Sequence, residues 1–320
     1  MDVALTHFGT LPDGQEISKI TLQSDDMTVG ILTFGATLQS VVHACAPRNL
    51  TLGFNTIAPY LETGHFAGGI IGPVANRIAG AQASLGGSNH RFEANDTGNT
   101  LHSGAASWHL KNWHIADQGP GFVTLSLRST AGDGGFRAAY HVTATYQLIG
   151  PHLTLAIIAR ADAATWIAPA QHSYWNLSGA DTIDEHTLSV AADHYLATDA
   201  QGIPTHRAPV KGTSFDLRRA SPIAQRRLDH NFCLSDTRRT LTPAATLRSP
   251  EGLSLDIATT DVGLQVYDGG FLDVAGHGPR SFIALEAQGW PNAMNRPDFP
   301  NTRLEPRQIF HQITRWTITP

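Results

Sequence analysis

Charged residues are scarce in this 320-residue chain: they make up 15% of the sequence, and the formal net charge is −5. Binding to the phosphate backbone of a nucleic acid needs clustered Lys and Arg side chains, and this balance provides no basic face. We therefore expect no nucleic-acid partner.

Cysteine is nearly missing as well, with Cys45 and Cys233 the only two. This number excludes a disulfide-rich scaffold and favours reduced thiols, although one disulfide between distant strands stays open. Neither cysteine lies in a CxxC motif, and no two histidines have the spacing of a HExxH helix. Zinc is therefore disfavoured, and we expect no metal and no cofactor.

Long apolar runs do not occur either. No stretch approaches the length of about 20 residues that crosses a bilayer as a helix. The first residues, MDVALTHFGTLPDGQE, have neither the positive region nor the apolar segment of a signal peptide. We expect a soluble cytoplasmic protein with no membrane partner, present as a monomer or a homodimer.

Helical periodicity is rare, and strand patterns take its place. Apolar and polar residues alternate in short runs, which is typical of half-buried antiparallel strands. The clearest runs lie at 123–127, 140–148 and 153–159, and further strands are predicted at 17–23, 29–42, 253–257, 264–267 and 313–318. Short helices are expected only near 58–63 and 293–299.

Turn residues separate these runs and predict hairpins. Gly, Pro, Asn and Asp gather at 11–14, 86–89, 132–135 and 149–152. Strand patterns continue from end to end without a linker, a low-complexity tract or an internal repeat. We predict a single all-β domain over residues 1–320, built as a many-stranded antiparallel β-sandwich.

One carboxylate stands out in the stretch FIALEAQGWPNAMNRPDFPN, residues 282–301. On a strand, Glu286 and Gln288 point to the same face as the apolar Phe282 and Ala284. The Pro- and Asn-rich residues that follow make a stiff loop. A carboxylate walled by apolar groups beside a rigid loop is a candidate catalytic base. The alternative for this stretch is an edge-strand Glu beside a Trp-Pro turn.

Two more stretches carry polar groups where a strand should end. Asn76 and Arg77 follow a glycine-rich run, and the planar fork of Arg77 could hold adjacent sugar hydroxyls or could stiffen a loop through a salt bridge. His102 lies between small residues that leave room for a ligand. Because most of the 16 histidines must be solvated or structural, His102 alone is a weak candidate.

The segment QHSYWNLSG, residues 171–179, places His172 beside Tyr174 and Trp175. Sugars present apolar C–H faces that pack on aromatic rings and hydroxyls that need polar partners, so this segment suggests sugar binding. The alternative is a Tyr-Trp core pair with an incidental histidine. Asp229, in the segment LDHNFCL, is equally compatible with an Asx-type turn.

Over most of the chain, the order of these stretches resembles the aldose 1-epimerase (galactose mutarotase) family. Each motif alone is weak, whereas six in order are specific: Asn76-Arg77-Ile78, Asn99-Thr100-Leu101-His102, His172-Ser173-Tyr174-Trp175-Asn176-Leu177, Asp229-His230-Asn231-Phe232, Gln265-Val266-Tyr267 and Leu285-Glu286-Ala287-Gln288.

The resemblance implies a large antiparallel β-supersandwich with a monosaccharide cleft on one concave sheet. It also implies that Glu286 is the catalytic base and His172 the catalytic acid. The residues that it implies for sugar binding are Arg77, His102, Asp229 and Gln265, with Asn76 and Trp175 as neighbours. The chemistry asks for such a pair independently, because opening a hemiacetal ring requires taking a proton from the C1 hydroxyl and giving one to the ring oxygen.

Four positions depart from the family pattern, namely Pro73, Val74, Ser103 and Asp268. They leave the acid and the base untouched. They put the preferred sugar in doubt, because residues that contact hydroxyls decide specificity. Galactose, glucose, a pentose and an unusual hexose all stay open, and the lack of a strongly basic pocket favours a free sugar over a sugar phosphate.

Two rival classes of function also stay open. A non-catalytic sugar-binding protein could dispense with Glu286 or His172, and the presence of both favours an enzyme. A glycoside hydrolase or a lyase on a related sandwich would need a second carboxylate, which Asp229 or Asp268 could supply.

Overall fold

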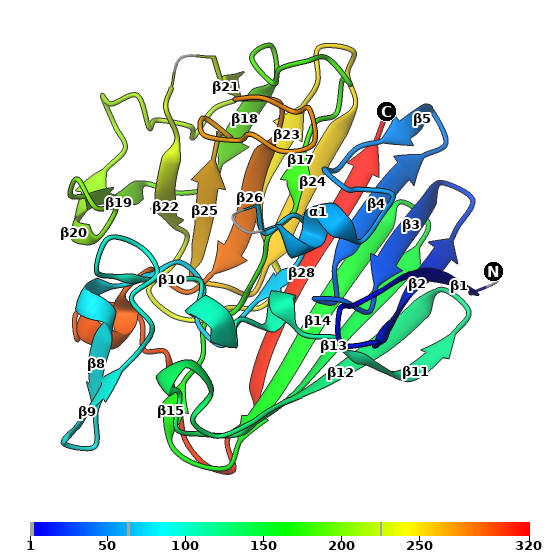
Figure 1. Cartoon of the computed structure of the whole chain (residues 1–320). Coiled ribbons are helices and arrows are strands. Elements are labelled where there is room, and N and C mark those ends of the chain that lie inside the picture. Colours follow the sequence, from blue (N-terminus) through cyan, green and yellow to red (C-terminus); the bar gives the residue numbers. More distant parts are fainter. Residues whose placement is uncertain (1–2, 63–64, 225) are drawn as a thin grey trace.

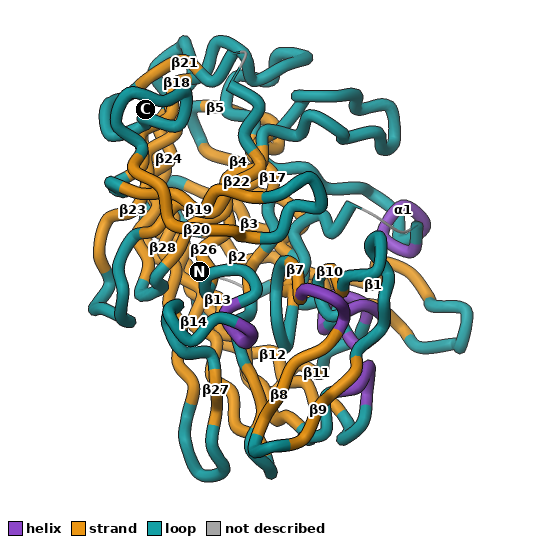
Figure 2. Tube along the Cα trace, turned by 90° about the vertical axis from the view of Figure 1, so that its left-hand side faces the viewer, coloured by secondary structure: helices purple, strands orange, loops and turns teal. Residues whose placement is uncertain are grey.

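Antiparallel strands are the main regular structure of the protein, as the alternating sequence predicts (Figure 1). The computed structural model of the chain describes residues 3–62, 65–224 and 226–320. Over these residues the strands form three large sheets and four two-stranded pairs. Figure 2 shows how little of the chain is helical.

The N-terminal sheet follows the chain order and contains β1 (Ala4–Thr10), β2 (Glu16–Gln23), β3 (Met27–Leu32), β4 (Leu38–His43) and β5 (Ala46–Asn49). The largest sheet has the spatial order β11 (His114–Gly119), β12 (Phe122–Ser129), β13 (Tyr140–Ile149), β14 (His152–Ala161), β28 (Phe310–Thr319), β24 (Ser254–Thr259), β23 (Thr242–Arg248), β18 (Thr187–Val190) and β21 (Ser221–Pro222). The third sheet has the order β17 (Tyr174–Trp175), β26 (Ile283–Gln288), β25 (Gly263–Tyr267), β22 (Asp229–Cys233), β19 (His194–Thr198) and β20 (Pro204–Pro209).

Short pairs and single helical turns complete the described chain. The pairs are β6 (Ile70–Ile71) with β16 (Ala170–Gln171), β7 (Arg77–Ile78) with β10 (Thr100–Leu101), β8 (Gln82–Leu85) with β9 (Ser88–Arg91), and β15 (Thr165–Trp166) with β27 (Arg303–Leu304). The helices are α1 (Ala58–Leu61) and the 3₁₀ turns Ala79–Ala81, Gly104–Ala106, Trp108–Leu110, Asp133–Gly135 and Ala293–Asn295. Each helix in the described ranges is too short or too polar to span a bilayer.

Most predicted strands are confirmed, and one prediction is wrong. The run 29–42 is not one strand, because the chain turns back between β3 and β4, where Gly35 and Ala36 have φ values of 68° and 47°. The helix predicted near 58–63 is present as α1, and residue 63 lies outside the described residues. Near 293–299 a single 3₁₀ turn forms at Ala293–Asn295. The two cysteines are free thiols.

One hydrophobic cluster takes side chains from all three large sheets, for example Ile31, Leu155 and Leu285. On the third sheet the alternate residues Leu264 and Val266 face this core. Because successive side chains of a strand point to opposite faces, the other face of the third sheet is left for polar residues. This polar face carries the candidate site. The division of residues 1–320 into a single domain stays a prediction.

Candidate active site

The strand register brings three polar residues into line on one face of the third sheet. Glu286 on β26 lies opposite Gln265 on β25, and Gln265 lies opposite Asn231 on β22. Asp229, two residues before Asn231, shares that face, and the Gln265 side-chain amide donates a hydrogen bond of 2.7 Å to its carboxylate. The sheet therefore holds Glu286 on a rigid element with a hydrogen-bonded pair beside it.

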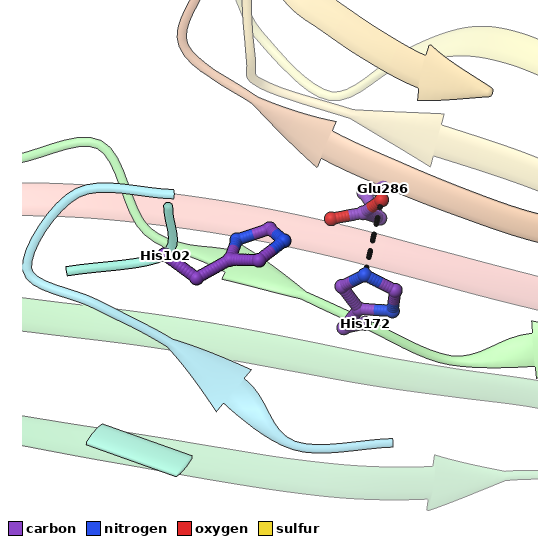
Figure 3. Close-up of side chains that lie close together, drawn as sticks. All are labelled: His102, His172 and Glu286. Atoms are coloured by element: carbon purple, nitrogen blue, oxygen red, sulfur yellow. Dashed lines mark ion pairs between the residues drawn. The ribbon is translucent and has the colours of Figure 1, made fainter. Parts of the chain in front are cut away.

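His172 reaches Glu286 from a different part of the fold (Figure 3). It follows β16, and its backbone exchanges hydrogen bonds with the glycine loop before β6: its N–H donates to the Gly69 carbonyl, and its carbonyl accepts from the Gly68 N–H. Nε2 of His172 lies 3.5 Å from Oε1 of Glu286, and the two side chains are only 4% and 2% exposed. Backbone bonds on both sides of His172 thus fix the imidazole against the carboxyl.

His102 completes the group seen in Figure 3. Its Nδ1 accepts a hydrogen bond of 3.1 Å from the Asn76 backbone N–H. A neutral imidazole that accepts at Nδ1 carries its proton on Nε2. Burial lowers the pKa of His102 well below its ordinary value, with His172 adding to the effect, so the ring stays neutral. His102 is therefore a hydrogen-bond donor through Nε2.

Arg77 lies at the edge of the same site and has an anchored guanidinium. Its Nε donates to the Asp96 carboxylate at 2.7 Å, and a Cβ on Gly202 would come within 2.7 Å of the guanidinium. The backbone N–H of Arg77 donates to the side-chain oxygen of Asn76, which has a left-handed φ of 60°. The salt bridge considered as an alternative role is therefore present, and it orients an Arg77 that also lines the cavity.

These side chains surround a cavity of about 270 Å³. Seven of the eight predicted site residues line it: Asn76, Arg77, His102, His172, Asp229, Gln265 and Glu286. The other lining residues are His65, Phe66, Leu101, Tyr174, Tyr267, Phe271, Leu272 and Asp273. A cavity with several convergent polar groups and an apolar wall is the usual form of a small-molecule site.

Burial shifts the two groups of the central pair in opposite directions. It lowers the pKa of His172 to about 4. It raises the pKa of Glu286 well above its ordinary value, and the Asp229 carboxylate adds to this shift. Both shifts favour the uncharged forms, so one proton is held by the pair and lies on Glu286 when the cavity contains no sugar.

The cluster of His102, His172 and Glu286 has the composition of a metal site, since one possible ligand atom from each lies within 4.8 Å of the others. The hydrogen bonding of His102 argues against this role. Its Nδ1 is occupied by the Asn76 N–H, and its Nε2 bears the proton, so a neutral His102 has no free lone pair to offer an ion. Two ligands would then remain from the cluster.

Comparison with known proteins identifies the family. The aldose 1-epimerase family model matches residues 18–316. The galactose mutarotase of Mus musculus is 33% identical over 98% of each chain, and the aldose 1-epimerase of Haemophilus influenzae is 35% identical over 91% of this chain and 92% of its own length.

The chain belongs to the aldose 1-epimerase family. Both names denote carbohydrate epimerases, so the predicted family and the predicted enzyme class, an isomerase, are confirmed.

Solved structures agree with this family and with the predicted fold. The GalM/aldose epimerase homologue from C. elegans has a TM-score of 0.89 at 26% identity, covering 94% of this chain and 98% of its own. The galactose 1-epimerase from Lactobacillus acidophilus has the same TM-score and identity, covering 100% and 99%. The galactose mutarotase-like β-supersandwich is therefore confirmed.

One of the predicted site residues, Trp175, does not line the cavity. Trp175 is fully buried in the main core and packs near Trp316. Neighbouring residues of a strand point to opposite faces, so on β17 Tyr174 lines the cavity and Trp175 faces away from it. The same alternation could have selected Tyr174, and it also puts Tyr267 on the face of Gln265. Phe66, by contrast, gave no sequence signal.

Two departures from the family pattern turn out to be structural. The Ser103 hydroxyl donates to the Val74 carbonyl and accepts from the Val74 N–H, at 2.7 and 3.0 Å. Asp268 is not among the residues that line the cavity, so it does not supply there the second carboxylate that a hydrolase or a lyase would need. It is buried, forms an ion pair of 2.7 Å with Arg280 and accepts from the Leu228 N–H at 3.0 Å. Asp268 thus joins loops and lies outside the cavity lining.

Proposed function

We propose that this protein interconverts the α and β anomers of a free aldose, with Glu286 as general base and His172 as general acid. The observation that carries this proposal is the buried pair of a carboxyl and an imidazole at 3.5 Å, facing a cavity lined by hydroxyl-binding side chains. The family membership supports the same reaction.

Ring opening needs two proton transfers within one sugar. Ionised Glu286 takes the proton of the C1 hydroxyl while protonated His172 gives a proton to the ring oxygen, and the C1–O5 bond breaks to leave an open-chain aldehyde. Rotation about the C1–C2 bond presents the other face of the carbonyl. Ring closure reverses both transfers and returns the pair to its starting form.

Before the ring can open, the proton of the buried pair has to move from Glu286 to His172. The neutral pair and the ion pair contain the same number of protons, so sugar binding, and not a change of pH, has to shift the proton from Glu286 to His172. The second oxygen of Glu286 has no hydrogen-bond partner among the described residues, and a sugar hydroxyl that donates to it would stabilise the carboxylate. Hydrogen bonds from the substrate therefore favour the active form.

The remaining polar groups would bind and orient the sugar. His102 donates through Nε2, Asp229 accepts, and the Gln265 amide holds Asp229 in place. The Arg77 guanidinium is partly compensated by Asp96, and Asp229 adds a negative group to the wall. The balance of charge supports a neutral sugar rather than a sugar phosphate.

Polarimetry on freshly dissolved α-D-galactose, α-D-glucose and a pentose tests the reaction, with the spontaneous rate as baseline. We expect faster approach to the same final rotation, and the order of rates identifies the preferred sugar. Incubation with a disaccharide provides the second arm, because a mutarotase releases no monosaccharide. Release of monosaccharide would favour a hydrolase, and an unchanged rotation rate for every sugar would favour a binding protein.

A further inference from the structure

Gln312 links the two chain segments that carry the proposed acid and base. It lies on β28, in the largest sheet, and is only 3% exposed. Its side-chain nitrogen donates hydrogen bonds of 3.2 Å to the carbonyls of Pro169 and Ala287. Pro169 lies three residues before His172, and Ala287 directly follows Glu286. One buried amide therefore binds the backbone beside both members of the pair.

The two segments are held by different strand pairs. β16, which ends at Gln171 just before His172, pairs with β6. Glu286 lies on β26, which pairs with β25 and β17. Because these ladders fix each segment to its own neighbours, the distance of 3.5 Å between His172 and Glu286 also depends on how the segments are placed relative to each other. The Gln312 side chain bridges the two segments at that point.

Asp261 holds the Gln312 amide in this position. Its carboxylate accepts a third hydrogen bond from the same nitrogen, and since all three partners are acceptors, the amide must present its nitrogen to them. Asp261 is 2% exposed, its carboxylate forms an ion pair of 2.8 Å with Arg238, and its backbone N–H donates to the Thr259 hydroxyl at 3.1 Å. The loop that joins β24 to β25 therefore supports Gln312.

Gln312 is placed to affect the reaction without touching the sugar. It is not among the residues that line the cavity of Glu286, whereas His102 and Asp229, which are proposed to bind hydroxyls, do line it. The acid and the base must reach two oxygens of one sugar, and a displacement of about 1 Å from the productive geometry can cost about 10²-fold in rate. A buried amide that holds both backbones should therefore affect turnover more than affinity.

We infer that Gln312 is a positioning residue, which holds the proposed acid and base at the separation that one sugar ring requires. It acts through the carbonyls of Pro169 and Ala287, and Asp261 fixes its amide in place. The inference rests on the proposed function, because that function assigns the pair its roles as acid and base.

Gln312→Met tests this role, because Met keeps an unbranched side chain of similar length and has no N–H to donate. Gln39→Met is the matched control. Gln39 is also 3% exposed, and its side-chain nitrogen donates to the Phe54 carbonyl at 3.0 Å, in a segment that carries neither member of the pair. Any loss of thermal stability that the two variants share is then the cost of removing a buried amide.

Polarimetry on fresh α-D-galactose provides the first measurement. Gln312→Met should lower kcat about tenfold and leave KM within about twofold, because the pair is displaced and the hydroxyl-binding groups are not. Gln39→Met should change neither constant. Should Gln312→Met fail to fold, as judged by thermal unfolding, Gln312→Asn repeats the test, because it keeps the amide on a side chain that is shorter by one methylene and should show the same split between kcat and KM.

NMR of the histidine rings provides a measurement that does not depend on catalysis, with the His172 signal assigned by its loss in His172→Gln. Burial lowers the pKa of His172 to about 4. The ring of the unmodified protein should therefore stay neutral between about pH 5 and 8. In Gln312→Met the loosened pair should admit water, and the pKa of His172 should rise toward its ordinary value of about 6.5. Gln39→Met should titrate as the unmodified protein does.

Three results would overturn the inference: an unchanged kcat in Gln312→Met, a fall in kcat that Gln39→Met shows equally, or an unchanged titration of His172. If the unmodified protein accelerates the mutarotation of no sugar, the proposed function fails. The titration of His172 in Gln312→Met then still decides whether Gln312 positions the pair.

Discussion

Replacing Glu286 by Gln should remove the proposed base and keep the shape of the cavity. The amide has the same number of heavy atoms as the carboxyl, and position 286 is held in register opposite Gln265. A positioned acid or base typically contributes about 10²- to 10⁴-fold to a rate, which is about 2.7–5.5 kcal/mol of activation free energy. Because Glu286 and His172 hold one proton between them, loss of either group disables both transfers, and we expect a loss at the upper end of this range.

Sugar binding should survive the substitution. The groups proposed to contact hydroxyls, such as His102 and Asp229, keep their hydrogen bonds to Asn76 and Gln265. Thermal stability should not fall, because burial already favours an uncharged group at position 286. Polarimetry on fresh α-D-galactose measures the rate, and calorimetry on the equilibrated sugar measures the affinity.

Glu305→Gln serves as the matched control, because it removes a partly exposed carboxylate that pairs with Arg303 and does not line the cavity of Glu286. It should leave the mutarotation rate unchanged. A fully active Glu286→Gln enzyme would refute the assignment of the base. Parallel loss of rate and affinity would instead make Glu286 a binding residue.

Three further outcomes follow from the site and its surroundings. The acid limb of the kcat/KM profile should lie near pH 4 and not near 6.5, because burial lowers the pKa of His172 and a second proton on the pair, which inactivates it, is added only in stronger acid. The raised pKa of Glu286 sets the alkaline limb, where the pair loses its one proton. Trp175→Ala should lower the free energy of unfolding by about 3–5 kcal/mol in chemical denaturation, because Trp175 is buried in the core. The galactose KM of the folded variant should be unchanged, and a raised KM would indicate that Trp175 contributes to the site. Asp268→Asn should lower stability by about 1–3 kcal/mol through loss of the Arg280 ion pair, and a change in sugar preference without a change in stability would contradict that role.

Strand positions, and the face of the sheet to which each side chain points, could be predicted from the sequence, because alternation is a local property of the chain. Parity alone put Glu286 and Gln288 on one face, and the register agrees. The turn inside 29–42 was missed, because a Gly-Ala turn between apolar residues interrupts the pattern only weakly. Trp175 was misplaced, because the motif that contains it marks the neighbourhood of the site without saying which of two adjacent aromatics faces the cavity.

Contacts between segments that are far apart in the chain could not be predicted from the sequence. Nothing local indicates that the Asn76 N–H fixes the tautomer of His102, or that Asp268 is buried and paired with Arg280. The contacts of the Phe66 ring with His102 and His172 likewise depend on packing between segments that are far apart in the sequence. The residue types of the site could be predicted from the sequence, whereas the orientations of their side chains are set by tertiary packing.

Burial gives the proposed catalytic pair, Glu286 and His172, a property that neither side chain has in water. A solvated Glu at neutral pH is ionised and a solvated His exchanges protons readily, since their ordinary pKa values are about 4.3 and 6.5. In the cavity the pKa of His172 falls to about 4 while that of Glu286 rises, so the pair keeps one proton over the whole interval between these two values. Ring opening takes one proton from O1 and gives one to O5, and ring closure reverses both transfers, so the complete reaction needs no net proton from the solvent. A pair with a constant proton count is matched to that reaction, and activity should therefore be flat across the interval in which the count is constant.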